Sequence, residues 1–117
     1  MGLKIQMGVK RNILIIRLNG DLDQYGCRKL KVRVVDTIRK YDIQNIILNF
    51  ENLYFMDSTG IGFIIGRYQD IKRKNGKIVI CNVNEIVNKI FRISGLNKIC
   101  KVVSTEEDAY KELVAAC

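Results

Sequence analysis

The sequence contains no histidine and no proline, and its four cysteines form no C-x-x-C pair. Structural zinc sites normally use such cysteine pairs or mixtures of cysteine and histidine, so we expect no metal and no cofactor. Histidine is also the commonest general base and the usual partner of a catalytic serine or cysteine. Its absence disfavours a stand-alone enzyme, which we keep as an alternative, and favours a protein that acts by binding.

Long apolar runs are absent as well. No stretch of about 18 apolar residues occurs, so no transmembrane segment is predicted. The first residues lack the apolar core of a signal peptide, and Gln6 stands where a myristoylation motif requires serine or threonine. Cys27, Cys81 and Cys100 lie within apolar patterns, which indicates reduced core residues. We therefore expect a cytoplasmic protein without a membrane partner.

The net charge is strongly positive. Twenty lysines and arginines against 12 aspartates and glutamates give a net charge of +8. This charge permits binding to nucleic acid, so a nucleic-acid-binding domain is an alternative. The basic residues are dispersed along the chain, however, and no aromatic residues are interleaved with them. We expect a solvated basic surface and no direct contact with nucleic acid.

The 117 residues, with 48% hydrophobic and 27% charged residues, predict a single domain over residues 1–117. Hydrophobic periodicity predicts strands at 3–7, 12–18, 45–50, 77–81 and 99–103, with a turn at Gly8 and 10–12. The first helix is expected to begin at Asp23 and to carry an apolar stripe that ends at Tyr41. Further helices are expected over 57–74, over 85–94, and after 104–108. Residues 51–56 are expected to form a short connection. The order β-β-α-β-α-β-α-β-α predicts an α/β fold with a mostly parallel sheet and helices packed on it.

The start of the second helix carries the most informative pattern. Gly60, Gly62 and Gly66 lie in its first half, where each glycine costs about 0.5–1 kcal/mol relative to alanine. Ser58, Gly62 and Gly66 follow one line of the helix, at spacings of four. The expected core stripe faces elsewhere and consists of Ile61, Ile64, Ile65, Tyr68 and Ile71. Phe63 is expected to project away from that stripe, beside a glycine-lined groove that a partner contacts.

Two other interpretations of this segment remain open. Asp57, Ser58 and Thr59 all cap helices well, so the segment could be an ordinary helix start. Asp23 could likewise be no more than the cap of the first helix. The glycine spacing matches neither a Rossmann fingerprint nor a Walker sequence, so nucleotide binding has little support.

Three motifs, in order along almost the whole chain, resemble the STAS domains of the anti-sigma factor antagonist family. The segment Met56–Gly62 resembles the phosphorylation motif of that family. The residues Gly20–Asp23 resemble its upstream loop, and Ser94–Leu96 resemble the turn after its third helix. The stretch Phe55–Tyr68 is especially similar to the sporulation sigma-F branch. The resemblance implies the STAS fold.

The resemblance also implies a partner-switching role. The unmodified protein would bind an anti-sigma factor that is also a serine kinase, the kinase would phosphorylate Ser58, and a separate serine phosphatase would reverse the modification. We expect a monomer when the protein is free. The partner-binding residues are expected to be Asp23, Asp57, Thr59, Gly60, Ile61, Gly62, Phe63, Gly66 and Ile90. A STAS module of another signalling complex, such as a stressosome, is the main alternative.

Overall fold

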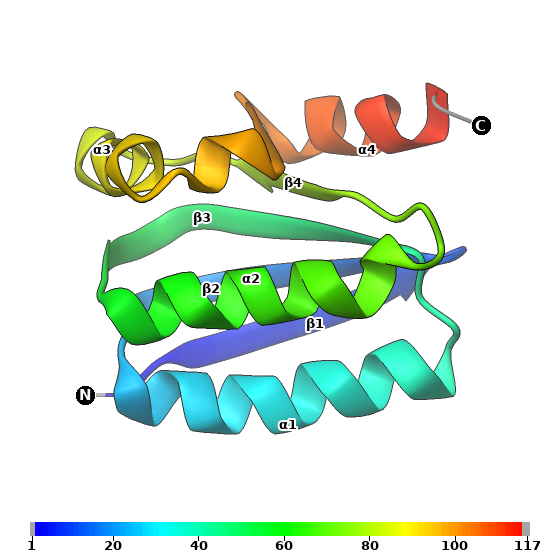
Figure 1. Cartoon of the computed structure of the whole chain (residues 1–117), viewed down its shortest axis with the longest axis horizontal. Coiled ribbons are helices and arrows are strands. Elements are labelled where there is room, and N and C mark those ends of the chain that lie inside the picture. The colour runs from blue at the N-terminus through cyan, green and yellow to red at the C-terminus, as the bar shows by residue number, and fades with distance from the viewer. Residues whose placement is uncertain (1, 116–117) are drawn as a thin grey trace.

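The computed structural model describes residues 2–115, so Cys117 lies outside the described residues. The elements are β1 (Lys4–Lys10), β2 (Ile13–Leu22), α1 (Gln24–Lys40), β3 (Asn45–Met56), α2 (Ser58–Lys72), β4 (Ile78–Cys81), α3 (Glu85–Ser94), the 3-10 turn η1 (Leu96–Lys98), β5 (Cys100–Val103) and α4 (Glu106–Ala115). The strands form one sheet in the order β1-β2-β3-β4-β5. β1 is antiparallel to β2 and the other pairs are parallel, which confirms the predicted fold class (Figure 1).

Helices cover the two faces of the sheet unequally. The larger core lies between the sheet and α1, α2 and α3, and alternate residues of the central strands point into it. The intervening residues, such as Ile13, Ile47 and Val79, pack against α4 on the opposite face. The first parts of β2 and β3 and the whole of β4 are therefore nearly continuous apolar runs, as in strands buried on both faces.

The first hairpin differs from its prediction. Gly8 lies within β1, and the chain turns later, at Arg11, whose φ is 57°. β2 continues to Leu22 and does not end at the expected residue 18. Tyr41, the expected end of the first helical stripe, lies at the C-cap of α1 and is exposed.

The segment predicted to be a short connection is the second half of β3, so that prediction was wrong. Two irregularities in the pairing of β2 with β3 shift the register, one of them between Arg17 and Asn19. A bulge adds a residue to one strand and interrupts the alternation of its side chains. Phe50, Leu53 and Met56 are consequently all buried at a spacing of three. Alternation, the signal used to predict strands, is lost over this stretch.

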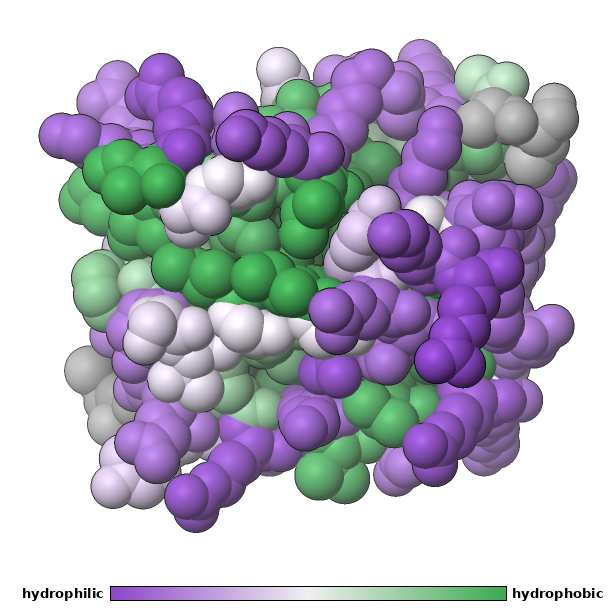
Figure 2. Space-filling view, in the orientation of Figure 1, coloured by the Kyte–Doolittle hydropathy of each residue, from purple (hydrophilic) through white to green (hydrophobic). Residues whose placement is uncertain are grey.

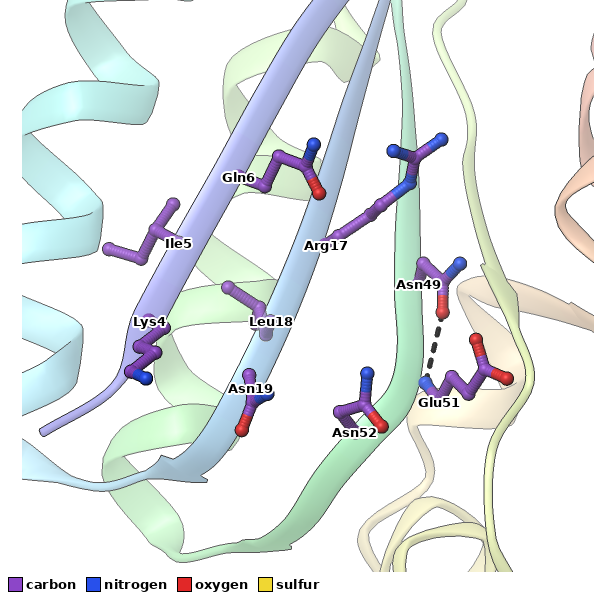
Figure 3. Close-up of a pocket in the computed structure, with 9 residues that line it drawn as sticks. All are labelled: Lys4, Ile5, Gln6, Arg17, Leu18, Asn19, Asn49, Glu51 and Asn52. Carbon is purple, nitrogen blue, oxygen red and sulfur yellow. Dashed lines mark hydrogen bonds between the residues drawn. The ribbon is translucent and has the colours of Figure 1, made fainter. Parts of the chain in front are cut away.

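An ion pair links the sheet to α4. Arg17 of β2 donates to both carboxylate oxygens of Glu106, at 2.9 and 2.7 Å, and Asn49 of β3 donates to the same carboxylate at 2.8 Å. Figure 3 shows Arg17 extending from β2 toward β3, beside a polar hollow of about 240 Å³ on the open part of this face. The backbone N–H of Glu51 donates a hydrogen bond to the side-chain oxygen of Asn49 at 2.9 Å, and both residues line the same hollow. The network attaches the C-terminal helix to the two central strands.

The network predicts a pH-dependent contribution to stability. The hydrogen bond from Arg17 lowers the pKa of Glu106 below its ordinary value of 4.5. A carboxyl whose pKa is lower in the folded state stabilises the fold above its unfolded pKa, and the contribution is lost as the pH falls through the lowered value. Glu106→Gln should reduce the free energy of unfolding by about 1 kcal/mol at neutral pH. This deficit should shrink as the pH falls below 4.5 and through the lowered pKa, as followed by urea titrations across the pH range.

The control is Glu107→Gln, which removes an exposed carboxylate 3.3 Å from Lys111. Exposed pairs contribute little, so this variant should change stability by less than about 0.5 kcal/mol. A Glu106→Gln deficit that stays constant with pH would contradict the assignment and indicate a packing effect.

The start of α2 lies close enough to β2 to require glycine. A Cβ built on Gly60 would lie 2.9 Å from the carbonyl oxygen of Leu22 and 3.0 Å from the Cβ of Met56. Gly60→Ala should therefore destabilise the domain by about 1–3 kcal/mol in thermal or urea unfolding. Gly62→Ala is the matched control, because nothing lies within 4 Å of its Cβ position. It should stabilise the domain by about 0.5–1 kcal/mol, and equal effects of the two changes would refute the contact.

Candidate functional site

Ser58 is the first residue of α2 and is exposed. Asp57 precedes it as the N-cap, and its side chain accepts hydrogen bonds from the backbone N–H groups of Thr59 at 2.9 Å and Gly60 at 3.3 Å. The predicted helix start is confirmed, and so is the capping role of Asp57. Because Asp57, and not Ser58, caps the first turn, the Ser58 side chain remains accessible to another molecule.

The loop that contains Asp23 lies next to the loop that contains Ser58. The backbone N–H of Asp57 donates to the carbonyl of Leu22 at 3.4 Å, one residue before Asp23. Asp23 caps α1 by accepting from the N–H of Gly26 at 3.0 Å. Burial raises the pKa of Cys27 to about 11, and the charges of Asp57 and Asp23 add to this rise. Both carboxylates therefore act on one buried thiol at this end of the sheet.

The third helix begins at the same end of the molecule (Figure 1). Asn84 caps α3 by accepting from the N–H of Val87 at 2.8 Å, and it donates to the carbonyl of Leu53 in β3 at 2.9 Å. Ile90 is half-buried against the core. Two other apolar residues of α3 are strongly exposed, Ile86 at 62% and Ile93 at 78%.

The orientation of α2 about its axis differs from the prediction. Phe63 is only 6% exposed and belongs to the main core, whereas Ile65, expected in the core, is 39% exposed. The guanidinium of Arg67 lies 5.2 Å from the Phe63 ring, on the side that faces α1. The expectation that Phe63 projects away from the core was wrong. Apolar residues occur on several sides of α2, so their spacing did not determine which side is buried.

The glycines of α2 divide into two kinds. Gly60 is buried against Leu22. Gly62 and Gly66 have no atom within 4 Å of an added Cβ, and both open onto a groove of about 410 Å³ between α1 and α2. Thr59 and Phe63 line the same groove. The structure thus places four of the expected partner-binding residues together.

Sequence reasoning missed the exposed aromatic residues near this end. Tyr54 and Phe55, at the end of β3, are 59% and 47% exposed, and Tyr25 in the first turn of α1 is 81% exposed. Figure 2 shows hydrophobic surface over α3 and along one side of α2, next to a paler row of small residues. The available signal was the Tyr-Phe pair between two apolar residues, but it lay in the segment interpreted as a connection.

This arrangement is suited to docking and to modification of a hydroxyl. Among residues 2–115 no group of three or more cysteine, aspartate or glutamate side chains is placed to hold a metal ion. In the same part of the chain, no helix has both the length and the apolar character needed to cross a bilayer. Ser58, two helix-capping carboxylates and exposed apolar side chains are the features that this end of the sheet presents.

Comparison with protein families and relatives gives a consistent result. The model of the STAS domain matches residues 4–109. The anti-sigma F factor antagonist of Paenibacillus polymyxa is 38% identical over 97% of both chains. The protein of the same name from Lysinibacillus sphaericus is 32% identical over 93% of this chain and 92% of its own.

Solved structures show the same fold. The unphosphorylated anti-sigma factor antagonist SpoIIAA is 26% identical, with a TM-score of 0.78 over 97% of this chain and 100% of its own. The phosphorylated form of SpoIIAA, the Bacillus cell fate determinant, is 32% identical, with a TM-score of 0.75 over 94% and 99%. The family model, the identity over almost the full length and the shared fold show that this chain belongs to the STAS-domain family.

Proposed function

We propose that this protein is an anti-sigma factor antagonist that acts by binding and not by catalysis. In its unphosphorylated form it binds an anti-sigma factor that is also a serine kinase, and so releases the sigma factor. Phosphorylation of Ser58 ends this binding, and a serine phosphatase restores it. The observation that carries the proposal is the exposed serine at the start of α2, beside an apolar surface. The names of the relatives support it.

We divide the proposed interface into a centre and an edge according to the exposure and position of its residues. Thr59 and Gly62 are exposed on α2, so they form its centre, together with the half-buried Ile61 and Gly66. Asp23 and Ile90, on neighbouring elements, form its edge. Ile65 joins the surface because it is exposed.

Three further residues support the interface from beneath its exposed surface. Asp57 caps the helix, Gly60 lets it approach β2, and Phe63 forms the floor of the groove. The free, buried Cys27, Cys81 and Cys100 suit a reducing cytoplasm, where we propose that the protein works as a monomer until it meets its partner.

The helix start makes the switch physically reasonable. A phosphoserine carries about −1.5 to −2 charges at neutral pH. The N-terminus of α2 attracts that charge, while Asp57 and the neighbouring Asp23 repel it, so the domain itself should gain or lose little. A docked partner would instead have to bury a dianion, which is costly without a matched cation. Phosphorylation would thus disrupt the complex and leave the fold intact.

One observation favours a second candidate, a nucleic-acid-binding domain. A hollow of about 610 Å³ beside β4 and β5 is lined by four lysines from separate segments, Lys72, Lys77, Lys98 and Lys101, and by Glu112. The lysines that are dispersed in the sequence meet here in space. A steep loss of affinity for nucleic acid with rising salt would support this candidate. It explains neither the serine nor the apolar surface at the other end, so we rank it second.

The phosphoacceptor can be tested directly. Incubation with candidate sigma-F-type anti-sigma kinases and ATP should add one phosphate to the wild type, as read by intact mass. Ser58→Ala should remain unmodified, because we propose Ser58 as the main acceptor and the adjacent Thr59 hydroxyl only as its competitor. Thr59→Ala is the matched control and should still be phosphorylated. Full phosphorylation of Ser58→Ala would show that the acceptor was assigned to the wrong residue.

The exclusion mechanism can be tested separately. Melting curves and amide-exchange maps of the phosphorylated and unmodified proteins should nearly coincide. Calorimetric affinity for the anti-sigma factor should fall at least about tenfold, or about 1.4 kcal/mol. Ser58→Asp should weaken binding less, since a carboxylate carries less charge and bulk than a phosphate. A large loss of exchange protection across the sheet would mean that phosphorylation acts by refolding.

A further inference from the structure

We propose that the groove between α1 and α2 binds an acidic segment of the partner protein, with an apolar side chain of that segment placed over Gly62 and Gly66. The inference rests on the proposed function for the identity of the partner, and it adds the binding position and the chemistry of the bound segment. The groove is lined by Gln24, Cys27, Arg28 and Lys31 of α1 and by Thr59, Gly62, Phe63, Gly66 and Arg67 of α2.

The fold does not require the two glycines that keep this groove open. A Cβ on either Gly62 or Gly66 would meet no atom within 4 Å. Alanine would fit at both positions and would favour the helix by about 0.5–1 kcal/mol each. The domain therefore forgoes stability to leave this space empty, and a docked side chain is an occupant that would benefit from it.

The floor of the groove is mostly apolar, and the charge of Arg67 in that floor is already neutralised by Asp70. Phe63 and Cys27 are each 6% exposed, and burial raises the pKa of the Cys27 thiol to about 11, so the thiol stays neutral. Arg67 is also buried. It donates to Asp70 at 2.8 Å and lies over the Phe63 ring. An apolar side chain, and not a small hydrated anion, suits such a floor.

The rim on the α1 side is basic. Arg28 and Lys31 are both exposed, and neither forms an ion pair with a carboxylate within residues 2–115. Two unpaired cations along an apolar groove complement carboxylates on a segment that also carries an apolar residue. From Thr59 to Arg67 the groove follows α2 for about 12 Å, since a helix rises about 1.5 Å per residue. This length accommodates two turns of a helix or a short extended peptide.

The position of the groove links it to the switch. Ser58 precedes Thr59 at one end of the groove and lies on the helical line of Gly62 and Gly66, four and eight residues away. A phosphate on Ser58 would repel an acidic segment and would attract the same rim cations. Phosphate and partner would then compete for Arg28 and Lys31, so that binding is lost without a change of fold.

A charge-reversal pair tests the proposal. The double variant R28E/K31E should bind the anti-sigma factor at least about tenfold more weakly than the wild type in calorimetry. The control K29E/R33E reverses the same number of charges on the same helix at exposed positions outside the groove. It should bind within about threefold of the wild type at physiological salt. Equal losses in both variants would overturn the proposal, because net charge alone would then explain them.

A second pair of variants does not depend on charge. Gly62→Ala and Gly66→Ala should each raise the melting temperature and still weaken binding, because the added methyl occupies the groove. Unchanged affinity in both would exclude the groove as the binding position, while binding by the wild type would leave the proposed function intact. A wild-type protein that binds no anti-sigma factor would overturn the proposed function and this inference together.

Discussion

The close contact between the first turn of α2 and the end of β2 is the constraint on which the rest of the site depends. Gly60 has no room for a side chain against Leu22, and the Asp57 N–H bonds to the carbonyl of that same residue. This contact fixes the inner side of the turn, and Asp57 caps the helix from that side. Ser58 is therefore turned outward and is exposed.

The two ends of the molecule carry different kinds of side chains. At the carboxyl ends of the parallel strands lie Ser58, the capping aspartates and exposed apolar residues of α2 and α3. At the opposite end of β4 and β5 lie the four lysines that line the hollow of about 610 Å³. A net charge of +8 is thus compatible with a specific apolar interface, because much of the charge lies elsewhere. Within residues 2–115, Arg28 and Lys31 are the lining residues that bring unpaired positive charge to the groove beside the serine.

The features predicted correctly are those fixed by neighbours in the chain. Asp23, Asp57 and Thr105 each accept a hydrogen bond from a backbone N–H group two or three residues later, so helix starts could be recognised locally. Alternating strands and helices with short connections predicted the mostly parallel sheet. The second half of β3 was missed because its register shifts depend on pairing with β2, a strand more than 20 residues earlier.

The sequence by itself determined that a serine opens α2 and that small residues follow it at helical spacing. Tertiary structure decided which side of that helix is buried. With Ile61, Phe63, Ile64 and Ile65 distributed around α2, its hydrophobic spacing permits several orientations, and packing against α1 buries Phe63 and exposes Ile65. The same packing brings α1 beside the glycines of α2. A groove between two helices depends on their mutual orientation, which long-range contacts set and no local pattern encodes.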